Sequence, residues 1–378
     1  MKVFLNIVVL SMLKLSLGHS QSPQIIWQKP LGGTAYDMGF DINSDYNTGY
    51  LIASSTQSSD GDVNNNHGSS DAWIVNLDNM GNIVWQKCFG GTAYDVLWSI
   101  QKTADSCYLL AGNTLSNNGD VSGNHGQADF WLIKIDQNGN LLWQNCYGGT
   151  DDDKGIKIIP TIDGANVVVG YTSSNDVQVS GNHGSDDIWL IKIDSTGILQ
   201  WQKCYGGSND DYAYDIIQRP NGNLIISGQS SSNDYDISGN HGGEDGILME
   251  TDDNGNIIWQ KSDGGTNHER FQHSCFDING NIISIGYTLS NDGDVSGNHG
   301  NADAWLVKSD LTGNIINQIC LGDTAEDVGL GIVKNSNNDF FISGRTGNLF
   351  QNYHGQMDYW ILKLDSIFNL QGSKCLGG

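Results

Sequence analysis

Basic side chains are scarce in this sequence of 378 residues. Lysine and arginine together number 18 against 43 acidic residues, which gives a formal net charge of −25 at pH 7. A surface of this sign repels the phosphates of nucleic acids and of anionic membranes. Nucleic acids are therefore excluded as partners, whereas cations, neutral sugars and proteins remain.

Proline and long apolar runs are also lacking. Only 4 prolines occur, and no stretch reaches the roughly 20 apolar residues of a membrane-spanning helix, so we expect no transmembrane segment. The sequence has no P-loop, no dinucleotide fingerprint, no Gly-x-Ser-x-Gly elbow, no His-Glu-x-x-His motif and no zinc-spaced Cys/His set. No isolated pair of carboxylates stands out as the acid and nucleophile of a glycosidase. These absences favour a protein without catalytic activity.

The sequence is built from repeats, and this feature decides the fold. The motif Ile-Ile-Trp-Gln-Lys recurs around Trp27, Trp85, Trp143, Trp201 and Trp259, with Asn317 and Gly372 in the same place later. A second motif, His-Gly-x-x-Asp-x-Trp, begins at His67, His125, His183, His241, His299 and His354. The spacing is 58 residues until a final step of 55. The chain therefore holds six similar units.

One unit, residues 33 to 91, has the alternation of four short strands at about 36–42, 50–53, 72–77 and 82–89. Four strands per repeat are the signature of a propeller blade. We therefore predict an all-β fold, a single closed β-propeller of six four-stranded blades over residues 21–378. Seven blades or a β-solenoid fit the repeat less well.

One terminal strand is surplus, because the chain has seven copies of the Trp strand but six of the His-Gly motif. A terminal copy that completes the sixth blade would remove an exposed sheet edge. The copy at residues 25–29 keeps its Trp, whereas the copy at residues 369–375 has lost it. We expect the N-terminal copy to complete the sixth blade.

The N-terminus has the pattern of an export signal. Lys2 precedes the apolar residues 3–13, and Gly18 and Ser20 are small residues that fit a signal-peptidase site. The pattern predicts a signal peptide over residues 1–20 and a secreted or cell-surface protein.

Seven cysteines occur, five of them at one position of the repeat: Cys88, Cys146, Cys204, Cys320 and Cys375. Equivalent positions in neighbouring blades should lie further apart than a disulfide allows. We therefore expect these cysteines to be small buried apolar residues rather than disulfide partners.

A hydroxyl, an imidazole, a carboxylate and an indole recur together in each unit. In the first unit they belong to Thr56, His67, Asp71 and Trp73. Such groups can satisfy one another inside a blade, and the set is similar to the structural tetrad of WD40 blades, although its order along the chain differs. A His beside an acid also suits general acid/base chemistry, but six copies favour the structural role. The residues assigned to it are His67, Asp71, Trp73, His125, Asp129, Trp131, His183, Asp187, Trp189, His299, Asp303 and Trp305.

The long second loop of each unit carries oxygen ligands at alternate positions, an arrangement that suits Ca²⁺. The candidate ligands are Asp60, Asp62, Asp120, Asp236, Asp292 and Asp294. Ca²⁺ is the one cofactor that the sequence suggests. Asx-turns explain the same residues without a metal.

An acidic residue follows the Gly-Gly pair of each unit by four positions. The set is Asp37, Asp95, Asp153, Asp211, Glu269 and Asp327. In a propeller it would begin the innermost strand, so the six carboxylates could form a binding ring for a cation or a polyhydroxylated ligand at the mouth of the central channel. The alternative is a turn carboxylate that caps backbone donors.

Unit five departs most from the repeat, with His-Glu-Arg-Phe-Gln-His at residues 268–273. Trp98 is the single Trp outside the two repeated positions, and Phe40 and Tyr214 are its aromatic equivalents. Such rings suit stacking on sugar faces, or they fill the inner strands.

The motifs Trp-Gln-Lys-x-x-Gly-Gly and Gly-Asn-His-Gly-x-x-Asp-x-Trp, the second in full at residues 297–305, resemble the propeller-like repeats of secreted Bacteroidetes proteins, some of them labelled endoglucanase-like. The resemblance covers residues 24 to 378 and implies a carbohydrate context, without catalytic residues that map onto this chain.

The leading hypothesis is a secreted, non-catalytic β-propeller that binds a carbohydrate or protein partner at the face carrying the long loops. The alternatives are a glycan-active hydrolase at the channel mouth, using ring carboxylates with His268 or His273, and a structural spacer of a cell-envelope assembly.

Overall fold

The computed structural model describes residues 5–8, 26–47, 49–347 and 357–377, and for residues 5–8 the backbone alone. These residues form strands joined by turns, and none of them is helical. The predicted all-β class is confirmed. Across these ranges there is accordingly no helix with the length and apolar character to cross a membrane.

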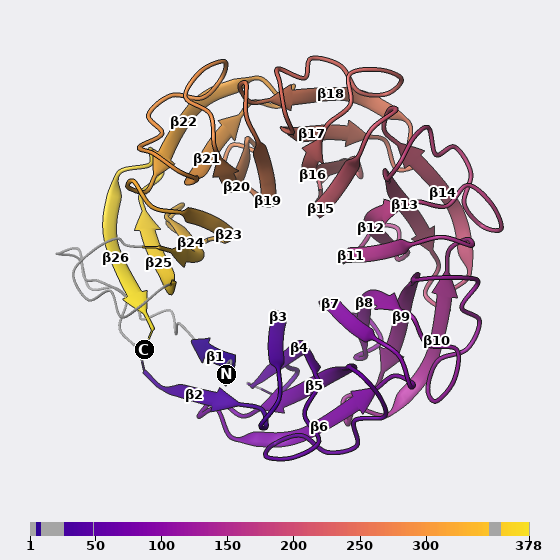
Figure 1. Ribbon diagram of the computed structural model, residues 1–378. Coiled ribbons are helices and arrows are strands. Elements are labelled where there is room, and N and C mark those ends of the chain that lie inside the picture. Colours follow the sequence, from indigo (N-terminus) through magenta and orange to yellow (C-terminus); the bar gives the residue numbers. More distant parts are fainter. Residues whose placement is uncertain (1–4, 9–25, 48, 348–356, 378) are drawn as a thin grey trace. The chain divides into compact units, whose positions relative to one another are not determined.

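Apart from one two-stranded sheet near the N-terminus, the strands form six sheets of four, and each of the six is an antiparallel meander in chain order (Figure 1). The predicted six four-stranded blades of a β-propeller are therefore confirmed. The chain divides into two compact units. Blades one to three belong to unit one, chiefly residues 25–182 and 186–204, and blades four to six belong to unit two, chiefly residues 205–378.

The strands of unit one are β3 (Asp37–Ser44), β4 (Tyr50–Thr56), β5 (Asp71–Leu77) and β6 (Ile83–Phe89) in blade one, β7 (Asp95–Lys102), β8 (Tyr108–Thr114), β9 (Asp129–Ile135) and β10 (Leu141–Tyr147) in blade two, and β11 (Asp153–Pro160), β12 (Asn166–Thr172), β13 (Asp187–Ile193) and β14 (Leu199–Tyr205) in blade three.

The strands of unit two are β15 (Asp211–Gln218), β16 (Leu224–Ser230), β17 (Asp245–Thr251) and β18 (Ile257–Asp263) in blade four, β19 (Glu269–Phe276), β20 (Ile282–Thr288), β21 (Asp303–Ser309) and β22 (Ile315–Leu321) in blade five, and β23 (Asp327–Lys334), β24 (Phe340–Thr346), β25 (Asp358–Leu364) and β26 (Leu370–Leu376) in blade six.

The sixth blade is completed by the C-terminal strand, so the expectation that the N-terminal copy would do so was wrong. β26 pairs with β25 along its length. The tight turn at Asp365, whose backbone N–H bonds the Asn369 carbonyl, makes this pairing a local hairpin. A lost Trp does not prevent it, because backbone hydrogen bonds hold the ladder. Instead, the N-terminal copy contributes β2 (Gln28–Leu31), which pairs with β1 (Leu5–Val8). Removal of residues 1–20 stays a prediction.

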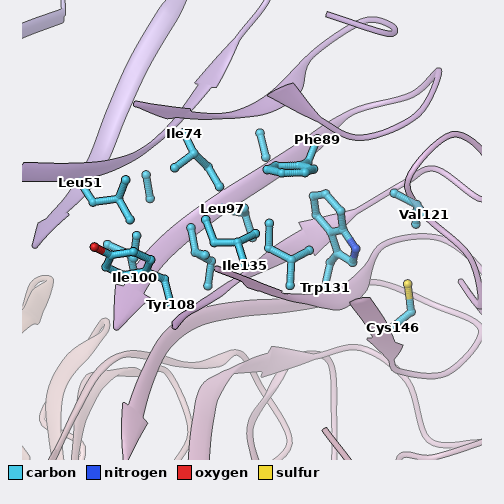
Figure 2. Packing of buried hydrophobic residues seen from close by; sticks show 14 residues of the cluster. Leu51, Ile74, Phe89, Leu97, Ile100, Tyr108, Val121, Trp131, Ile135 and Cys146 are labelled. Carbon is cyan, nitrogen blue, oxygen red and sulfur yellow. The ribbon is translucent and has the colours of Figure 1, made fainter. Parts of the chain in front are cut away.

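The hydrophobic core lies between successive blades of a unit. In unit one a single cluster joins Leu51, Ile74 and Phe89 of blade one to Leu97 and Trp131 of blade two (Figure 2). Trp131 is completely buried. Because apolar side chains pack on both faces of the sheet, the third strand of a blade is buried along its whole length, as in β5 and β9.

The repeated Trp of the fourth strand fastens its blade to the next one. The Trp85 indole donates through Nε1 to the Gln137 carbonyl oxygen at 3.2 Å, across the gap from β6 to the turn after β9. Gly139 in that turn has φ +76°, and a Cβ added there would lie 2.8 Å from the Trp85 ring. Glycine is therefore required at this position for two reasons: the positive φ of the backbone and the lack of space for a Cβ.

We predict that Gly139→Ala destabilises the protein by about 2–4 kcal/mol, because it adds left-handed backbone strain and a clash with the indole. Gly123→Ala is the matched control, since Gly123 has φ +87° but no atom within 4 Å of an added Cβ. Only the strain of about 1 kcal/mol applies there. Urea unfolding of both variants measures the difference, and equal losses would show that the indole contact contributes nothing.

All seven cysteines are free thiols. The predicted burial at the repeat position is confirmed for Cys88, Cys146, Cys320 and Cys375, and Cys204 is partly buried. Burial raises the pKa of the Cys88 thiol to about 12, so it stays uncharged and unreactive at neutral pH.

Candidate functional site

The acidic residue after each Gly-Gly pair is closed off from solvent. Asp153 in blade three is completely buried. Its carboxylate accepts hydrogen bonds from the Thr172 hydroxyl, from the Ser174 hydroxyl at 3.0 Å and from the backbone N–H of Gly149 at 2.7 Å. Burial raises the pKa of Asp153 to about 6, although these hydrogen bonds oppose the shift.

The other five acids of the set are equally buried: Asp37, Asp95, Asp211, Glu269 and Asp327 are each 0–1% exposed. Each accepts a hydrogen bond from the backbone at the repeated Gly-Gly or Gly-Asp position. Burial closes these carboxylates off from a ligand in solution, although Oδ1 of Asp327 has no hydrogen-bond partner. The positions therefore favour the capping interpretation over a binding ring.

The repeated polar set resolves into three separate contacts rather than one network. His67 Nδ1 lies 2.6 Å from Asp71 Oδ2. The Trp73 indole donates to Gln86 Oε1 at 2.9 Å, and Thr56 donates to Asp37 at 2.5 Å. Gln86 was missed in the sequence, although a Gln follows the Trp of the fourth strand in most units.

The same His–Asp and Trp–Gln contacts recur in other blades. His125, His241 and His299 lie 2.6 Å from Asp129, Asp245 and Asp303; the indoles of Trp131, Trp189 and Trp305 donate to Gln144, Gln202 and Gln318. Asp187 is buried, and the His183 ring lies 4.7 Å from that of Tyr235. His354 lies outside the described residues. Repetition of this kind is expected of a scaffold.

The loop aspartates turn toward backbone donors. Asp60 accepts the Thr34 N–H at 2.8 Å, and Asp62 accepts the Gly32 N–H at 3.2 Å. In the same way Asp120 accepts the Gly90 N–H, Asp292 the Thr266 N–H and Asp294 the Gly264 N–H. The backbone N–H of Asp236 donates to the Gly206 carbonyl oxygen. No group of three or more His, Cys, Asp or Glu suited to a metal occurs in the part of the chain that the structure describes. The geometry favours loop fastening, and Ca²⁺ stays a prediction.

A polar pocket of about 480 Å³ lies in unit two at the end of the blades that carries the long loops. Its lining residues come just before or after strands: Ser185, Asn209, Asp210, Ser231, Gly242, Gly243, Glu244 and His268. Glu244 Oε2 lies 3.6 Å from His268 Nδ1, and both side chains remain partly open to solvent. The Asn209 side chain is oriented by its bond to the Ser231 carbonyl oxygen at 3.1 Å.

Of these residues, the sequence analysis singled out His268 alone, as a departure of the fifth repeat from the common pattern. The pocket residues Asn209, Asp210, Ser231 and Glu244 were missed. Each of them sits one to three positions from a strand end, where the repeat varies. An alignment of the six repeats at their strand ends would have shown these residues as differences between repeats.

The other departures of the fifth repeat, which forms blade five, make contacts within the second compact unit. The Arg270 guanidinium lies 4.5 Å from the Tyr214 ring centre and 5.4 Å from that of Tyr287, distances typical of cation–π contacts. Phe271 is buried against Trp305, and His273 Nδ1 lies 3.7 Å from Asp215. In unit one, Trp98 packs on Phe40 with ring centres 4.1 Å apart. These residues therefore support the inner strands.

Comparison with known proteins gives no family. No protein-family model matches the sequence. The regulatory protein FlaEY of Caulobacter vibrioides is 29% identical over 193 residues, which is 46% of this chain and 20% of that protein. The chain thus spans about a fifth of the length of this relative.

Solved structures with a similar course of the chain include a protein of unknown function from Bacteroides caccae, at 12% identity over 81% of this chain and 95% of that chain, with a TM-score of 0.46. The Pan2 WD40 domain of Neurospora crassa is 11% identical over 80% and 85%, with a TM-score of 0.44. A gluconolactonase from Xanthomonas campestris is 12% identical over 83% and 95%, with a TM-score of 0.39. Similarities this low say nothing about what the chain binds.

Proposed function

We propose that the protein is a secreted, non-catalytic binding protein that takes a neutral carbohydrate into the pocket around Glu244 and His268. The observation that carries this proposal is the polar lining of the pocket, which presents carboxylates, an amide, hydroxyls and an imidazole within one concave space. Sugar hydroxyls both donate and accept, so they match such a mixture of groups. Neutral sugars are also unaffected by the formal net charge of −25.

An exposed aromatic ring that does not line the pocket is a second group suited to a sugar. Tyr235 is 71% exposed, and its ring lies against that of His183, two residues before the pocket residue Ser185. An exposed tyrosine held in place by a neighbouring ring can stack on the apolar face of a sugar. In the described residues no geometry favours the hydrolase over a binding role.

The test is a glycan-array screen of the purified protein, followed by calorimetric titration of the best ligand. We expect a neutral glycan to bind. Glu244→Gln should weaken it by about 10–100-fold, because a hydrogen bond to a charged group contributes roughly 1.5–3 kcal/mol. The substitution keeps the shape of the side chain.

Glu326→Gln is the matched control. Glu326 is the equivalent of His268 in the sixth blade, where it pairs with Arg345 at 2.6 Å on the surface. Its substitution should leave glycan affinity unchanged. Equal losses in both variants would refute the pocket. A protein partner captured in the absence of any glycan would refute the carbohydrate, and a protein that binds neither would act as a spacer.

A further inference from the structure

The fourth blade departs from the repeat at the end of its last strand, a place that sequence reasoning passed over. The final residue of the fourth strand is aromatic or leucine in the other blades, namely Phe89, Tyr147, Tyr205, Leu321 and Leu376. Blade four ends on Asp263 instead. The preceding Ser262 replaces the repeated cysteine.

The tyrosines show what this position does elsewhere. The Tyr147 hydroxyl donates to the Gly197 carbonyl oxygen at 2.5 Å, and the Tyr205 hydroxyl donates to the Gly255 carbonyl oxygen at 2.6 Å. Each glycine lies in the turn between the third and fourth strands of the following blade. Asp263 is too short to reach so far, and a pocket of about 470 Å³ lies between it and the corresponding turn of blade five at Gly313.

Three polar atoms of the residues lining this pocket lack a hydrogen-bond partner: Asp263 Oδ2, Gln260 Oε1 and Ser262 Oγ. Asp263 is only 6% exposed and Ser262 only 8%. The unpartnered amide oxygen of Gln260 has a clear cause. Equivalent glutamines of four other blades accept an indole N–H from the third strand, and blade four has Ile247 in place of that Trp.

These three atoms gather at one pocket, unlike most other unpartnered side-chain oxygens in the described residues. Among the described residues, the second oxygens of Asp71, Asp129, Asp245 and Asp303 also lack partners, but they recur from blade to blade at one repeat position and belong to the scaffold. Asp215 and Asp327 each keep one further unpartnered oxygen, and neither lines this pocket. Asp263 and Ser262 stand where the described parts of the other blades carry apolar residues or cysteine. A buried polar atom without a partner calls for an explanation, and a bound group that reaches all three atoms from the pocket would supply it.

The charges around the pocket bear on the sign of that ligand once Asp263 is ionised. Asp263 and Asp294 contribute carboxyl groups, and Lys261 contributes one ammonium group. His241 is held by Asp245 through Nδ1 at 2.6 Å, and its Nε2 lies 3.9 Å from Asp294 Oδ2. An ionised carboxylate can only accept hydrogen bonds, and so can the oxygen of a neutral side-chain amide. Once Asp263 is ionised, two carboxylates face the one ammonium group of Lys261, so a donor with a positive charge complements the lining.

We propose that this pocket binds the primary ammonium group of a ligand, with Asp263 as its counter-ion and Gln260 and Ser262 as further acceptors. An ammonium group presents three N–H donors and no acceptor. Its source is either a free amine, such as an amino sugar, or the lysine side chain of a partner protein. The pocket shares no residue with the one around Glu244 and His268, so either proposal can fail without the other.

The electrostatics of Asp263 give the proposal a distinctive signature. Burial, reinforced by the nearby Asp294, raises the pKa of Asp263 to about 8. The unliganded side chain is therefore largely protonated at pH 7. A bound ammonium group favours the ionised carboxylate and lowers this pKa, so binding must release a proton at neutral pH.

The test is calorimetric titration at pH 7 in two buffers of different ionisation enthalpy. The probes are glucosamine, its neutral relative N-acetylglucosamine, and Nα-acetyl-lysine methylamide. We expect an ammonium probe to bind with release of up to about one proton, and N-acetylglucosamine to give no binding heat. Binding of glucosamine alone identifies a free amine as the ligand, and binding of the lysine derivative alone identifies a protein side chain.

Two substitutions assign the heat to the pocket. Asp263→Asn should weaken ammonium binding at least tenfold and abolish the proton release. Asp120→Asn removes the carboxylate equivalent to Asp294 from blade two, where Phe89 fills the corresponding strand end, and should change neither. Thermal melts confirm that both variants fold. No heat with either ammonium probe, or unchanged affinity in Asp263→Asn, would overturn the proposal.

Discussion

Asp263→Asn should raise the free energy of unfolding at pH 8 and leave it nearly unchanged at pH 4. An unfolded Asp titrates near pH 4, whereas the folded pKa of Asp263 is about 8, mainly because of burial. Between these values the folded state holds a proton that the unfolded state has lost, so stability falls as pH rises. Each pH unit costs about 1.4 kcal/mol. The full penalty at pH 8 is up to about 5 kcal/mol.

The measurement is urea unfolding of wild type and Asp263→Asn at pH 4, 6 and 8. Asparagine cannot ionise, so the advantage of the variant should grow across this range. Asp153, whose pKa is raised to about 6, adds a pH dependence of the same sign below pH 6, but it is common to both proteins and cancels in the difference. Parallel curves for the two proteins would show that Asp263 is ionised and satisfied in the folded state.

Asp153→Ala should cost about 3–5 kcal/mol of stability. The substitution leaves two hydroxyl donors and the Gly149 N–H without an acceptor inside the protein, and each buried unsatisfied group costs roughly 1–3 kcal/mol. The effect should appear as a lower urea midpoint at pH 7.

Asp151→Ala is the matched control, because Asp151 lies two residues earlier in the same turn and is exposed. Its loss should change stability by no more than about 0.5 kcal/mol. If Asp153→Ala proved equally mild, the buried carboxylate would contribute little to the stability of the fold.

The blades could be predicted from the sequence because the repeat reports the same strands six times. Trp85 and its equivalents mark the fourth strand, and the His-Gly motif marks the entry to the third. The terminal strand was predicted wrongly because side-chain similarity was used as the guide. β26 lacks the Trp of the repeat, yet it pairs with β25 through a local turn and backbone hydrogen bonds.

The candidate sites were harder to predict, because a repeat draws attention to what its units share. Asp153 and its equivalents looked like ligand groups, but whether a carboxylate faces solvent or a Gly-Gly turn depends on the packing of the chain in three dimensions. The pockets arise where units differ. Ile247, Ser262 and Asp263 are visible as departures in the sequence, but only the structure shows that they leave unpartnered atoms beside one pocket.

Hydrogen–deuterium exchange with and without the best glycan tests the central claim most directly, since exchange reports where bound ligand slows local opening. We predict that protection appears in peptides covering residues 242–244 and 266–270, which hold Glu244 and His268. Protection confined to the loops of unit one, with these peptides unchanged while glycan is bound, would contradict the proposed site.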